Sequence, residues 1–530
     1  TMSDLNQSHS GIPLDPFYTA EEGDGNAPGV FPYTRGKRLP RPGQSWILRE
    51  LSGEGTATRS NEQFKSLMAK GQQGLDIIGD TPTMHMLDPD HPHAIHAVGT
   101  QGVSLCCRTD FEDLYRDLPL DELSFSQSLP SVPGIAGLYL VAKERGMPSE
   151  ILRGSAIQLA LYEDDCSYSR HLPLKLRMRM ATDSVAFAAE KMPKFHALME
   201  DTYFFSETGL DSVEEMALGF VELRYYIRAL LAKGIDIDAF APRIGILLTC
   251  RMDLFEEIAK IRATRRIYAR MMKDEFGAKD PRSMALTVTA HTSGLTMTAQ
   301  QPVNNVARGG MQAVAMAMAG VQAMEISTFD EAYRTPSEDA HMVGLRTQQI
   351  VQLETNVTKV ADPLGGSWYV EELTDKMDQR ICAELARIEA KGDIGELSEQ
   401  GFFRQIFNNA MERLSRDLED GTVQRVGVNS HSIPNEEDHM LKEASEKKTE
   451  PFRGQITHIQ NFRKNRDQDK CKQALGGLYD AVRDENRNMM EPYVAALEAD
   501  ATIGETAGVL RLAYGQKYDP LGNLPSPLGI

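Results

Sequence analysis

The amino-acid sequence predicts an α/β protein built around a parallel sheet or barrel. Between about residues 37 and 395, short strand-like runs alternate with helical patterns, while the segments on either side lack this alternation. Such alternation is typical of βαβ units, whose strands run parallel. The chain of 530 residues offers enough length for a large core, and a (β/α)₈ barrel alone takes about 250 residues.

The two flanking segments are predicted to differ from this body. Residues 1–36 contain four prolines and several glycines with no sustained period, which predicts an extended arm that wraps another part of the protein. After about residue 396 the strand signals fade, and a charged run at 435–448 precedes helical segments that end near Gly515. We therefore expect an arm at 1–36, a barrel domain at 37–395 and a helical C-terminal subdomain at 396–530.

Two helices carry clear start signals. At 253–276, apolar residues fall near one face, Asp253 and Glu256 have the spacing of a capping box, and Gly277 supplies a stop. In the last region, Thr502 and Glu505 repeat the capping-box spacing before another apolar run. Both helices are predicted to pack against the core.

Composition excludes several classes of function. The chain has 57 Lys and Arg against 76 Asp and Glu, a net charge of −19, which argues against a general binder of nucleic acid or of anionic membranes. No run of 18 apolar residues is present, and the first residues are polar and acidic, so we expect a cytoplasmic protein without a membrane span. The six cysteines show no CxxC spacing and are expected to be reduced, buried thiols.

Two predicted strands are polar on the face that a barrel would turn inward. Ser124, Ser126 and Ser128 occupy every second position of one strand, and Thr287, Thr289, His291 and Ser293 do so in another. Buried hydroxyl groups without partners cost about 1–3 kcal/mol each, so a polar ligand is expected along the axis. The alternative is that both are half-exposed edge strands whose hydroxyl groups face water.

Several long motifs occur in order along nearly the whole chain: PYTRG (32–36), NEQFKSLMAKGQQGL (61–75), DTPTMHMLDPDHP (80–92), FAPRIGILL (240–248), FEEIAKIRATRRIYARMMKDEFGAKDP (255–281), HTSGLTMTAQQPVNNVARG (291–309) and TKVADPLGGSWYVE (358–371). In these motifs the chain resembles the large, substrate-binding subunit of adenosylcobalamin-dependent acyl-CoA mutases, a family that includes methylmalonyl-CoA, isobutyryl-CoA and 2-hydroxyisobutyryl-CoA mutases. The resemblance implies a (β/α)₈ TIM barrel whose axis is lined by small hydroxyl residues and threaded by the pantetheine arm of CoA.

The resemblance also implies the reaction and its partners. It implies an isomerase that uses the radical chemistry of adenosylcobalamin to move a thioester carbonyl group to the neighbouring carbon. The family binds cobalamin through a histidine in a D-x-H-x-x-G motif on a flavodoxin-like domain, and none of the 12 histidines here has that context. The resemblance therefore implies a separate small cobalamin-binding subunit, a dimer of such heterodimers (a heterotetramer) and a G-protein chaperone.

A basic segment is expected to bind CoA. Arg35, Lys37, Arg38, Arg41 and Arg49 lie within fifteen residues of an otherwise acidic chain, and cations bind phosphate oxygens strongly. The alternative is a solvated basic loop. By resemblance, Trp46 and Arg49 line the acyl-CoA channel, whereas Gln44 replaces an arginine of the family.

The positions expected around the acyl group are unusually apolar. Leu51 stands where relatives carry tyrosine, phenylalanine or isoleucine, and Ile78 replaces the aspartate of the hydroxyisobutyryl enzyme. Gln158 matches a glutamine near the thioester. Where methylmalonyl enzymes present an arginine, this chain has Cys166, Ser167 and Tyr168, so a free carboxylate on the substrate would lack a cation unless Arg170 or Lys175 reached it. We expect a branched or bulky, even aromatic, acyl group.

The segment 201–209 departs most from the family, because Phe204 stands in place of a histidine that hydrogen-bonds the migrating carbonyl. Tyr203 and Glu207 are retained, and by resemblance contact the adenosyl group and its ribose. Phenylalanine cannot donate a hydrogen bond or a proton. His291 is the candidate replacement donor; the alternative is that it only lines the CoA channel.

Two further sets of residues have types suited to cofactor or metal binding. Gln322 and Glu354 match family positions that contact the cobalamin face and the adenosyl ribose. The cluster His85, Asp88, Asp90, His91, His93 and His96 has ligand-type side chains, but we interpret it as turn and cap formers and expect no metal.

Two other functions stay open from the sequence. One is an isobutyryl-CoA-like mutase with a small substrate. The other is a catalytically inactive paralogue that binds acyl-CoA, which the loss of the histidine favours and the retention of Tyr203 and Glu207 disfavours.

Overall fold

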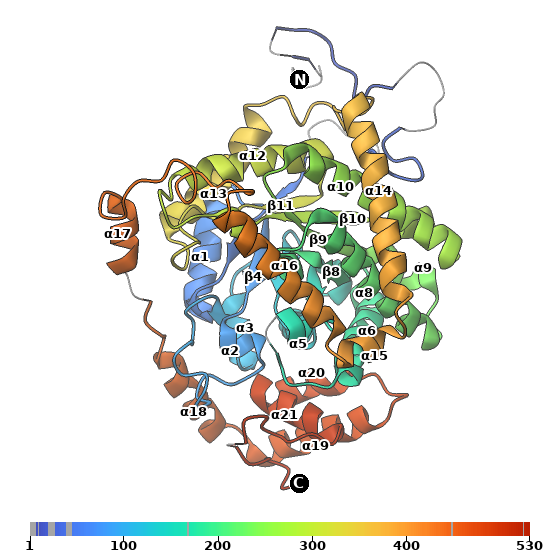
Figure 1. The fold of residues 1–530 in the computed structure, drawn as a ribbon. Helices are drawn as coiled ribbons and strands as arrows, with labels where there is room; N and C mark the ends of the chain where they lie inside the picture. Colours follow the sequence, from blue (N-terminus) through green and yellow to red (C-terminus); the bar gives the residue numbers. More distant parts are fainter. Residues whose placement is uncertain are drawn as a thin grey trace. The chain divides into compact units, whose positions relative to one another are not determined.

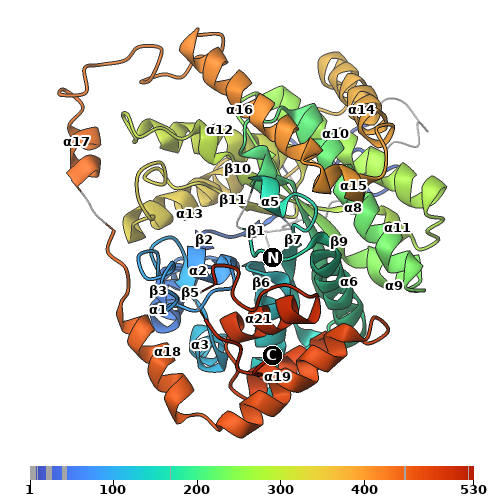
Figure 2. The same ribbon diagram turned by 60° about the horizontal axis from the view of Figure 1, so that its bottom comes forward.

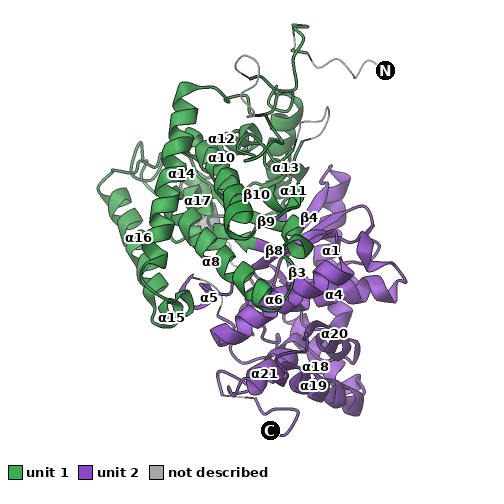
Figure 3. Cartoon of the chain, turned by 90° about the vertical axis from the view of Figure 1, so that its right-hand side faces the viewer, with its two compact units in different colours: residues 1–50, 200–447 green, residues 51–199, 448–530 purple. Residues whose placement is uncertain are grey.

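The computed structural model describes residues 7–8, 10–19, 27–38, 45–166, 169–446, 449–522 and 524–530. The chain forms two compact units, each made of two separate stretches (Figure 3). Unit 1 consists of residues 1–50 and 200–447, and unit 2 of residues 51–199 and 448–530. The division falls inside strand β8 (Phe195–Asp201).

The strands form a parallel α/β sheet of TIM-barrel type, as predicted. Its order is β1-β11-β10-β9-β8-β7-β6-β4-β2, with a separate pair β3-β5 (Gly55–Thr56 and Val103–Ser104). Strands that follow one another in sequence lie next to one another in the sheet because helices return the chain between them. Apart from β8, which the division crosses, four strands of this sheet belong to unit 1 and four belong to unit 2.

In unit 1, the strands are β1 (Ile47–Leu48), β9 (Ile244–Cys250), β10 (Thr287–Thr292) and β11 (Ala323–Glu325). Its helices are α7 (Thr202–Ser206), α8 (Ser212–Ala232), α9 (Ile237–Phe240), α10 (Leu254–Arg270), α11 (Pro281–Met284), α12 (Asn304–Ala319), α13 (Glu338–Leu353), α14 (Trp368–Glu389), α15 (Ile394–Glu399), α16 (Phe402–Glu419) and α17 (His439–Glu446). Helices α10 and α14 lie side by side (Figure 1), joined by ion pairs such as Arg262–Glu371 at 2.6 Å.

The helix predicted at 253–276 is confirmed as α10 and a π-helical turn, Met271–Glu275, that continues it. The Asp253 side chain accepts a hydrogen bond from the Glu256 amide at 3.4 Å. Gly277 follows with φ of +67°, a conformation that glycine adopts without strain and that ends a helix. Ile258 and Ile261 are fully buried, so the helix has the predicted packing role.

In unit 2, the strands of the main sheet are β2 (Leu51–Ser52), β4 (Gly74–Ile78), β6 (Ser124–Ser128) and β7 (Arg153–Gln158). Its helices are α1 (Ala57–Ala69), α2 (Thr81–Met84), α3 (Arg108–Leu114), α4 (Ser131–Glu144), α5 (Glu163–Cys166), α6 (Leu174–Lys191), α18 (Gly454–Asn465), α19 (Gln468–Arg483), α20 (Met490–Glu498) and α21 (Ile503–Ala513). The predicted capping box at the start of α21 is confirmed, because Thr502 and Glu505 exchange hydrogen bonds with each other's amides.

The described part of the N-terminal arm is attached to unit 1. The Ala361 amide donates to the Pro16 carbonyl at 2.9 Å, and Arg35 forms a buried ion pair with Asp362 at 2.7 Å while also donating to the Tyr18 carbonyl. At the other end of the chain, the described residues after Glu325 form helices and no named strand. Of these helices, α13–α17 belong to unit 1 and α18–α21 to unit 2.

Among the described residues, none of the helices combines the length and the apolar character that crossing a membrane would require.

Candidate active site

One face of β10 carries a continuous column of polar side chains in unit 1. The parallel register pairs Thr289 with Ala323 of β11 and Leu247 of β9, and pairs His291 with Glu325 and Thr249. Since alternate residues of a strand share a face, Thr287, Thr289 and His291 point the same way, and all three are buried. β10 has a partner strand on each side, and so does β6, so the alternative of two edge strands facing water is wrong.

At the amino end of β10, the column begins with a lysine from the basic segment. Lys37 donates to the Thr287 hydroxyl group. Burial, and then the positive charges of Arg243, Arg38 and Arg265, lower the pKa of Lys37 to about 8. An ammonium group close to three guanidinium groups attracts an anion strongly.

A surface cavity opens at this amino end. Its lining includes Lys37, Arg38, Trp46, Gln322 and Thr358. Trp46 is buried and donates from Nε1 to Gln348 Oε1 at 3.2 Å, which fixes the ring in the cavity wall. The placement of Trp46 beside Lys37 agrees with the predicted CoA channel.

The other members of the basic segment differ in their surroundings, although Arg35 also lines this cavity. Arg49 follows β1 and is buried, and its carbonyl oxygen accepts a hydrogen bond from Gln348. Arg35 is used in the ion pair with Asp362. The predicted phosphate contact Arg41 and its neighbour Gln44 lie outside the described residues.

In the middle of the column, His291 lies between Tyr203 and Glu325. The imidazole and phenol ring centroids are 4.5 Å apart, and His291 Nε2 is 4.0 Å from the Glu325 carboxylate. His291 Nδ1 lies 2.7 Å from the Thr292 carbonyl oxygen. Since a carbonyl oxygen only accepts, Nδ1 carries the hydrogen, and Nε2 becomes a donor when the ring is protonated.

At the carboxyl end, Tyr203, Glu207 and Glu331 converge on Gly294. A Cβ atom at Gly294 would lie 3.2 Å from Glu207 Oε2, 3.7 Å from Tyr203 Oη and 3.8 Å from Glu331 Oε1. The Glu207 carboxylate accepts from Ser293 Oγ at 2.8 Å and from the Leu295 amide at 2.9 Å. The two acids and the phenol therefore surround a stretch of bare backbone.

Burial changes the protonation of this end. It raises the pKa of Glu207, although the hydrogen bonds from Ser293 and Leu295 oppose the change. It raises the pKa of Glu331 to about 7, so this acid is partly protonated at neutral pH. Burial and the neighbouring Glu207 charge raise the pKa of the Tyr203 phenol well above its usual value, so the phenol stays neutral.

The turn that carries Tyr203 and Phe204 is held by hydrogen bonds beneath it. Asp201 caps α7 by accepting from the Phe204 amide at 3.1 Å. Behind it, Glu215 accepts from Thr202 Oγ1 and from the Thr249 amide, both at 2.9 Å, and pairs with the buried Lys260 at 3.0 Å. These contacts fix the backbone of the turn, while the Phe204 side chain itself is partly exposed.

Unit 2 has a similar polar face of its own. Register places Leu51 opposite Asp76, Asp76 opposite Ser126, and Ser126 opposite Ser155, so these side chains share one face with Ile78 and Ser124. The hydroxyl groups are used within the face: Ser155 donates to Ser126 at 3.0 Å, and Ser128 donates to Asp76 at 3.1 Å. Leu51 and Ile78 are partly exposed on it, whereas Tyr168 lies outside the described residues.

Gln158 lies on the opposite, helix-facing side of β7. Its side chain donates to Ser184 Oγ at 3.1 Å and to the Ala197 carbonyl at 2.9 Å, and accepts from Ser131 at 3.0 Å. These bonds connect β7 to the elements that pack beside it. The contact of Gln158 with the thioester stays a prediction.

Gln322 and Glu354 are not brought together with Tyr203 and Glu207. Gln322 precedes β11 at the amino end, where its side chain accepts from the Val288 amide at 2.8 Å and donates to the Gly320 carbonyl. Glu354 is exposed at the C-terminus of α13. Their contact with the cofactor stays a prediction.

The histidine-rich turn of unit 2 is built from caps and ion pairs. His91 lies 3.3 Å from the Asp519 carboxylate, and Arg463 pairs with Asp88 at 2.6 Å and with Asp90 at 2.7 Å. Asp88 also accepts from the Gly504 amide at the start of α21.

Sequence reasoning missed Glu331, Gly294 and the Glu215–Lys260 pair. Gly294 and Glu331 lie in the loops that follow β10 and β11, and loops at the carboxyl ends of barrel strands are the usual functional positions. That rule could have found both. The Glu215–Lys260 pair joins residues 45 positions apart on two helices, and no local pattern announces it.

Comparison with known proteins identifies the family. A family model described as methylmalonyl-CoA mutase matches residues 7–516. The chain belongs to the methylmalonyl-CoA mutase family.

Individual relatives agree with this assignment. The chain is 32% identical over 513 residues to a methylmalonyl-CoA mutase of Rhizobium meliloti (strain 1021), covering 95% of this chain and 72% of the relative. It is 33% identical over 518 residues to the 2-hydroxyisobutanoyl-CoA mutase large subunit of Aquincola tertiaricarbonis, covering 95% and 91%. A methylmalonyl-CoA mutase of Escherichia coli (strain K12) is 31% identical over 524 residues, covering 97% and 73%. The chain is thus the large subunit of an acyl-CoA mutase, an isomerase of the intramolecular transferase class from an adenosylcobalamin-dependent family.

Proposed function

We propose that this mutase rearranges the carbon skeleton of a branched or bulky acyl-CoA by a radical 1,2-shift of the thioester carbonyl group. The observation that carries the proposal is the order of groups along the β10 face of unit 1. Cations stand at its amino end, hydroxyl groups and His291 follow, and the Tyr203–Glu207 pair lies at its carboxyl end. An acyl-CoA presents phosphates, a polar arm and a reactive thioester in that same order.

The amino end supplies the charge that CoA needs. Lys37 is buried among arginines, and ammonium and guanidinium groups bind pyrophosphate and phosphomonoester oxygens by charge-assisted hydrogen bonds. The solvated-loop alternative fits poorly with a lysine whose ammonium group is bonded to Thr287 inside the sheet face. Lys37 is accordingly proposed as a principal phosphate contact.

The column has a length suited to the pantetheine arm. From Thr287 to His291 the strand rises by about 13 Å, at about 3.3 Å per residue. Thr287 and Thr289 offer hydroxyl groups along this path, and the thioester would lie near His291. Protonated His291, whose Nε2 faces Glu325, would donate to the migrating carbonyl oxygen in place of the histidine that Phe204 replaces.

The residues at the carboxyl end fit the adenosyl part of the cofactor. Glu207 is a buried acceptor for ribose hydroxyl groups, the Tyr203 ring offers a flat face, and the lack of a side chain at Gly294 leaves the backbone open to close approach. Adenosylcobalamin, when bound, supplies the radical chemistry that removes and returns a substrate hydrogen atom. The chain's own part is to position the thioester and to exclude water around it.

A separate small subunit is proposed to bind the cobalamin. Two observations support it: the Aquincola tertiaricarbonis relative is itself a large subunit, and the one D-x-H-x-x-G match of this chain, Asp339 to Gly344, lies inside helix α13 with His341 buried. Assembly as a dimer of heterodimers and loading by a G-protein chaperone extend the same proposal.

The acyl group is proposed to be branched or bulky because the family positions expected around it are apolar in this chain. Leu51 and Ile78 are partly exposed on the polar face of unit 2, and Phe204 is partly exposed beside Tyr203 in unit 1. Apolar side chains at such positions favour a hydrocarbon substituent over a carboxylate, which would require a cation.

The test is reconstitution with a candidate small subunit and adenosylcobalamin, followed by a panel of acyl-CoAs without oxygen. Product masses and cob(II)alamin absorbance are recorded for methylmalonyl-, isobutyryl-, 2-hydroxyisobutyryl- and larger branched or aromatic acyl-CoAs. We expect isomerisation of a larger member and none of methylmalonyl-CoA. If isobutyryl-CoA is turned over best, the proposed substrate changes from a bulky acyl-CoA to a small one. If the protein binds the cofactor but no acyl-CoA produces cob(II)alamin, the chain is an inactive paralogue.

A further inference from the structure

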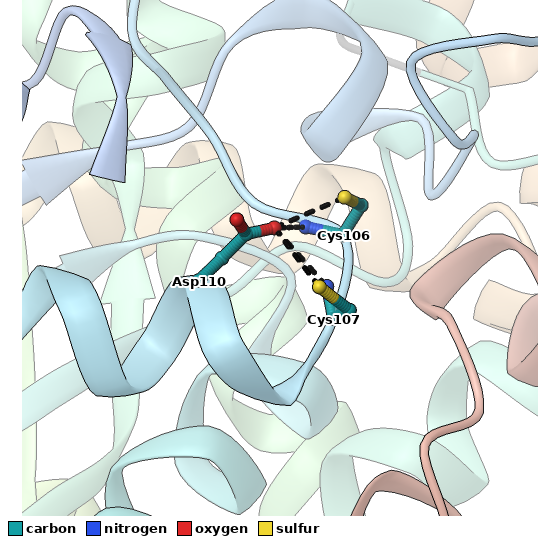
Figure 4. A group of neighbouring side chains, drawn as sticks. All are labelled: Cys106, Cys107 and Asp110. Carbon is teal, nitrogen blue, oxygen red and sulfur yellow. Dashed lines mark hydrogen bonds between the residues drawn. The ribbon is translucent and has the colours of Figure 1, made fainter. Parts of the chain in front are cut away.

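Two adjacent cysteines and an aspartate form a buried cluster in unit 2 that the proposed mutase site does not use. Cys106 and Cys107 precede α3, and Asp110 lies in its first turn (Figure 4). One possible ligand atom from each, two thiol sulfurs and a carboxylate oxygen, all lie within 4.8 Å of one another. The three side chains are almost entirely buried.

Asp110 draws both cysteines toward one carboxylate oxygen. Asp110 Oδ2 lies 3.0 Å from Cys106 Sγ and 3.5 Å from Cys107 Sγ, and accepts from both cysteine amides. The geometry brings two soft sulfur ligands and one oxygen ligand to the same point.

A histidine distant in sequence completes the cluster. His458 Nε2 on α18 lies 3.6 Å from Cys107 Sγ and 3.4 Å from Asp110 Oδ1. In a tetrahedral zinc site, bonds of about 2.3 Å to sulfur and about 2.0–2.2 Å to nitrogen and oxygen place neighbouring ligand atoms about 3.4–3.6 Å apart. The separations of Cys107 Sγ from Asp110 Oδ2 and from His458 Nε2 agree with this spacing. His458 is measured from the other carboxylate oxygen, Oδ1, and Cys106 Sγ lies 3.0 Å from Oδ2, so the Cys106 and His458 side chains would have to rotate for one ion to contact all four.

We propose that Cys106, Cys107, Asp110 and His458 bind a thiophilic divalent ion, Zn²⁺, in a structural site. Four protein ligands close the coordination shell, which is typical of structural rather than catalytic zinc. Gln455 supports the cluster, because its Nε2 donates to Asp110 Oδ1 at 3.0 Å and would orient that carboxylate.

The ion would attach α18 to α3, which lie beside one another in unit 2 (Figure 2). Helix α18 buries only Gln455 and Ile459. Ile459 packs against Cys106 and Cys107, and Gln455 contacts Asp110, so both anchors of the helix meet at this cluster. A metal bond from His458 would strengthen an attachment that otherwise depends on little buried apolar area.

The experiment uses the full chain purified without chelators. Zinc per chain is measured by elemental analysis, and the metal-free protein is then titrated with Co²⁺, whose thiolate charge-transfer absorption reports sulfur ligands. We expect about one zinc per chain and thiolate bands with cobalt, and at least a tenfold loss of affinity in Cys107→Ser and in His458→Gln. Cys471→Ser, another buried cysteine of unit 2, is the matched control and should keep the metal.

Protection of the thiols gives a second readout. Zinc should slow maleimide labelling of Cys106 and Cys107, measured by peptide mass, and leave labelling of Cys471 unchanged. If Cys107→Ser fails to fold, His458→Gln tests the site, since its side chain is about two-fifths exposed. The proposal is overturned if the folded wild-type chain takes up no zinc and gives no thiolate bands with cobalt. The cluster would then serve only as a hydrogen-bonded cap of α3.

Discussion

The two ends of strand β10 share one face but have opposite electrostatic surroundings. At the amino end, Lys37 lies among Arg38, Arg243 and Arg265, and its pKa falls to about 8. At the carboxyl end, Glu207 and Glu331 lie together, and burial raises the pKa of Glu331 to about 7. Each end therefore disfavours the charge that it already holds, and each gains when a ligand of suitable charge arrives.

The contrast teaches what each end selects. An excess of buried cations is stabilised by a polyanion, which suits phosphates. Buried acids with raised pKa values accept or share protons and hydrogen bonds with neutral hydroxyl groups, which suits a ribose rather than a second anion. The hydroxyl groups between them are neutral, so they guide a ligand without favouring either sign. The following predictions test whether the two ends act separately.

The largest effect is expected at His291, between the two ends. His291→Ala should lower turnover by about 100- to 1000-fold, because a donor to the developing charge on the thioester oxygen is lost. His291→Gln should recover part of the rate by restoring a neutral donor. Turnover with a saturating acyl-CoA is the measurement, and CoA affinity by calorimetry is the control and should change little. If the turnover of His291→Ala is within threefold of wild type, His291 only lines the channel and is not the donor.

Glu207→Ala should affect the carboxyl end alone. Loss of a buried acceptor for ribose hydroxyl groups should raise the half-saturating concentration of adenosylcobalamin by about 10- to 100-fold, which corresponds to about 1.4–2.7 kcal/mol. The half-saturating concentration is measured in the reconstituted complex, together with the dissociation constant of CoA. Glu214→Ala, which removes a partly exposed helix-capping acid of α8, is the matched control. An equal loss of CoA affinity in Glu207→Ala would mean that the two ends are coupled.

Lys37→Met should affect the amino end alone and should change how CoA affinity depends on pH. The wild-type lysine is charged below about pH 8, so CoA affinity should be highest there and should decline as the pH rises through 8. The variant should bind CoA about tenfold more weakly at pH 7, with a flatter profile between pH 7 and 9. Calorimetry at several pH values measures this, with Lys376→Met, an exposed lysine of α14, as control. A variant that keeps the wild-type slope would assign the titration to another group.

The parts of the fold that were predictable from sequence depend on local patterns. The alternation at 124–128 and 287–293, the capping pair Thr502 and Glu505, and the helix after Asp253 are all set by residues within a few positions of one another. The resemblance to the family then predicted that these alternating strands form a barrel. These expectations hold because hydrogen-bonding partners and apolar spacing are fixed along a short stretch of chain.

The parts that the sequence could not give depend on strand register and on which face a residue takes. A shift of one residue reverses the face of a strand, so a motif match alone did not reveal that Gln158 lies on the helix-facing side of β7. Nor did it reveal that Gln322 lies at the amino end of β11. Glu331 and the Lys260–Glu215 pair depend on contacts that form only when the strands and helices are assembled.

The smallest effect is expected from the neutral middle of the column. Thr289 donates to the Ile246 carbonyl at 3.2 Å, so Thr289→Val keeps the shape of the side chain but removes one hydrogen bond. The unfolding free energy should fall by about 0.5–1.5 kcal/mol, and CoA affinity should change by no more than a few-fold. Chemical denaturation and calorimetry measure the two quantities, with Thr289→Ser as the control that retains the hydroxyl group. A tenfold loss of CoA affinity in Thr289→Val but not in Thr289→Ser would show that the middle of the column binds the pantetheine arm directly and contributes to selectivity as much as its charged ends do.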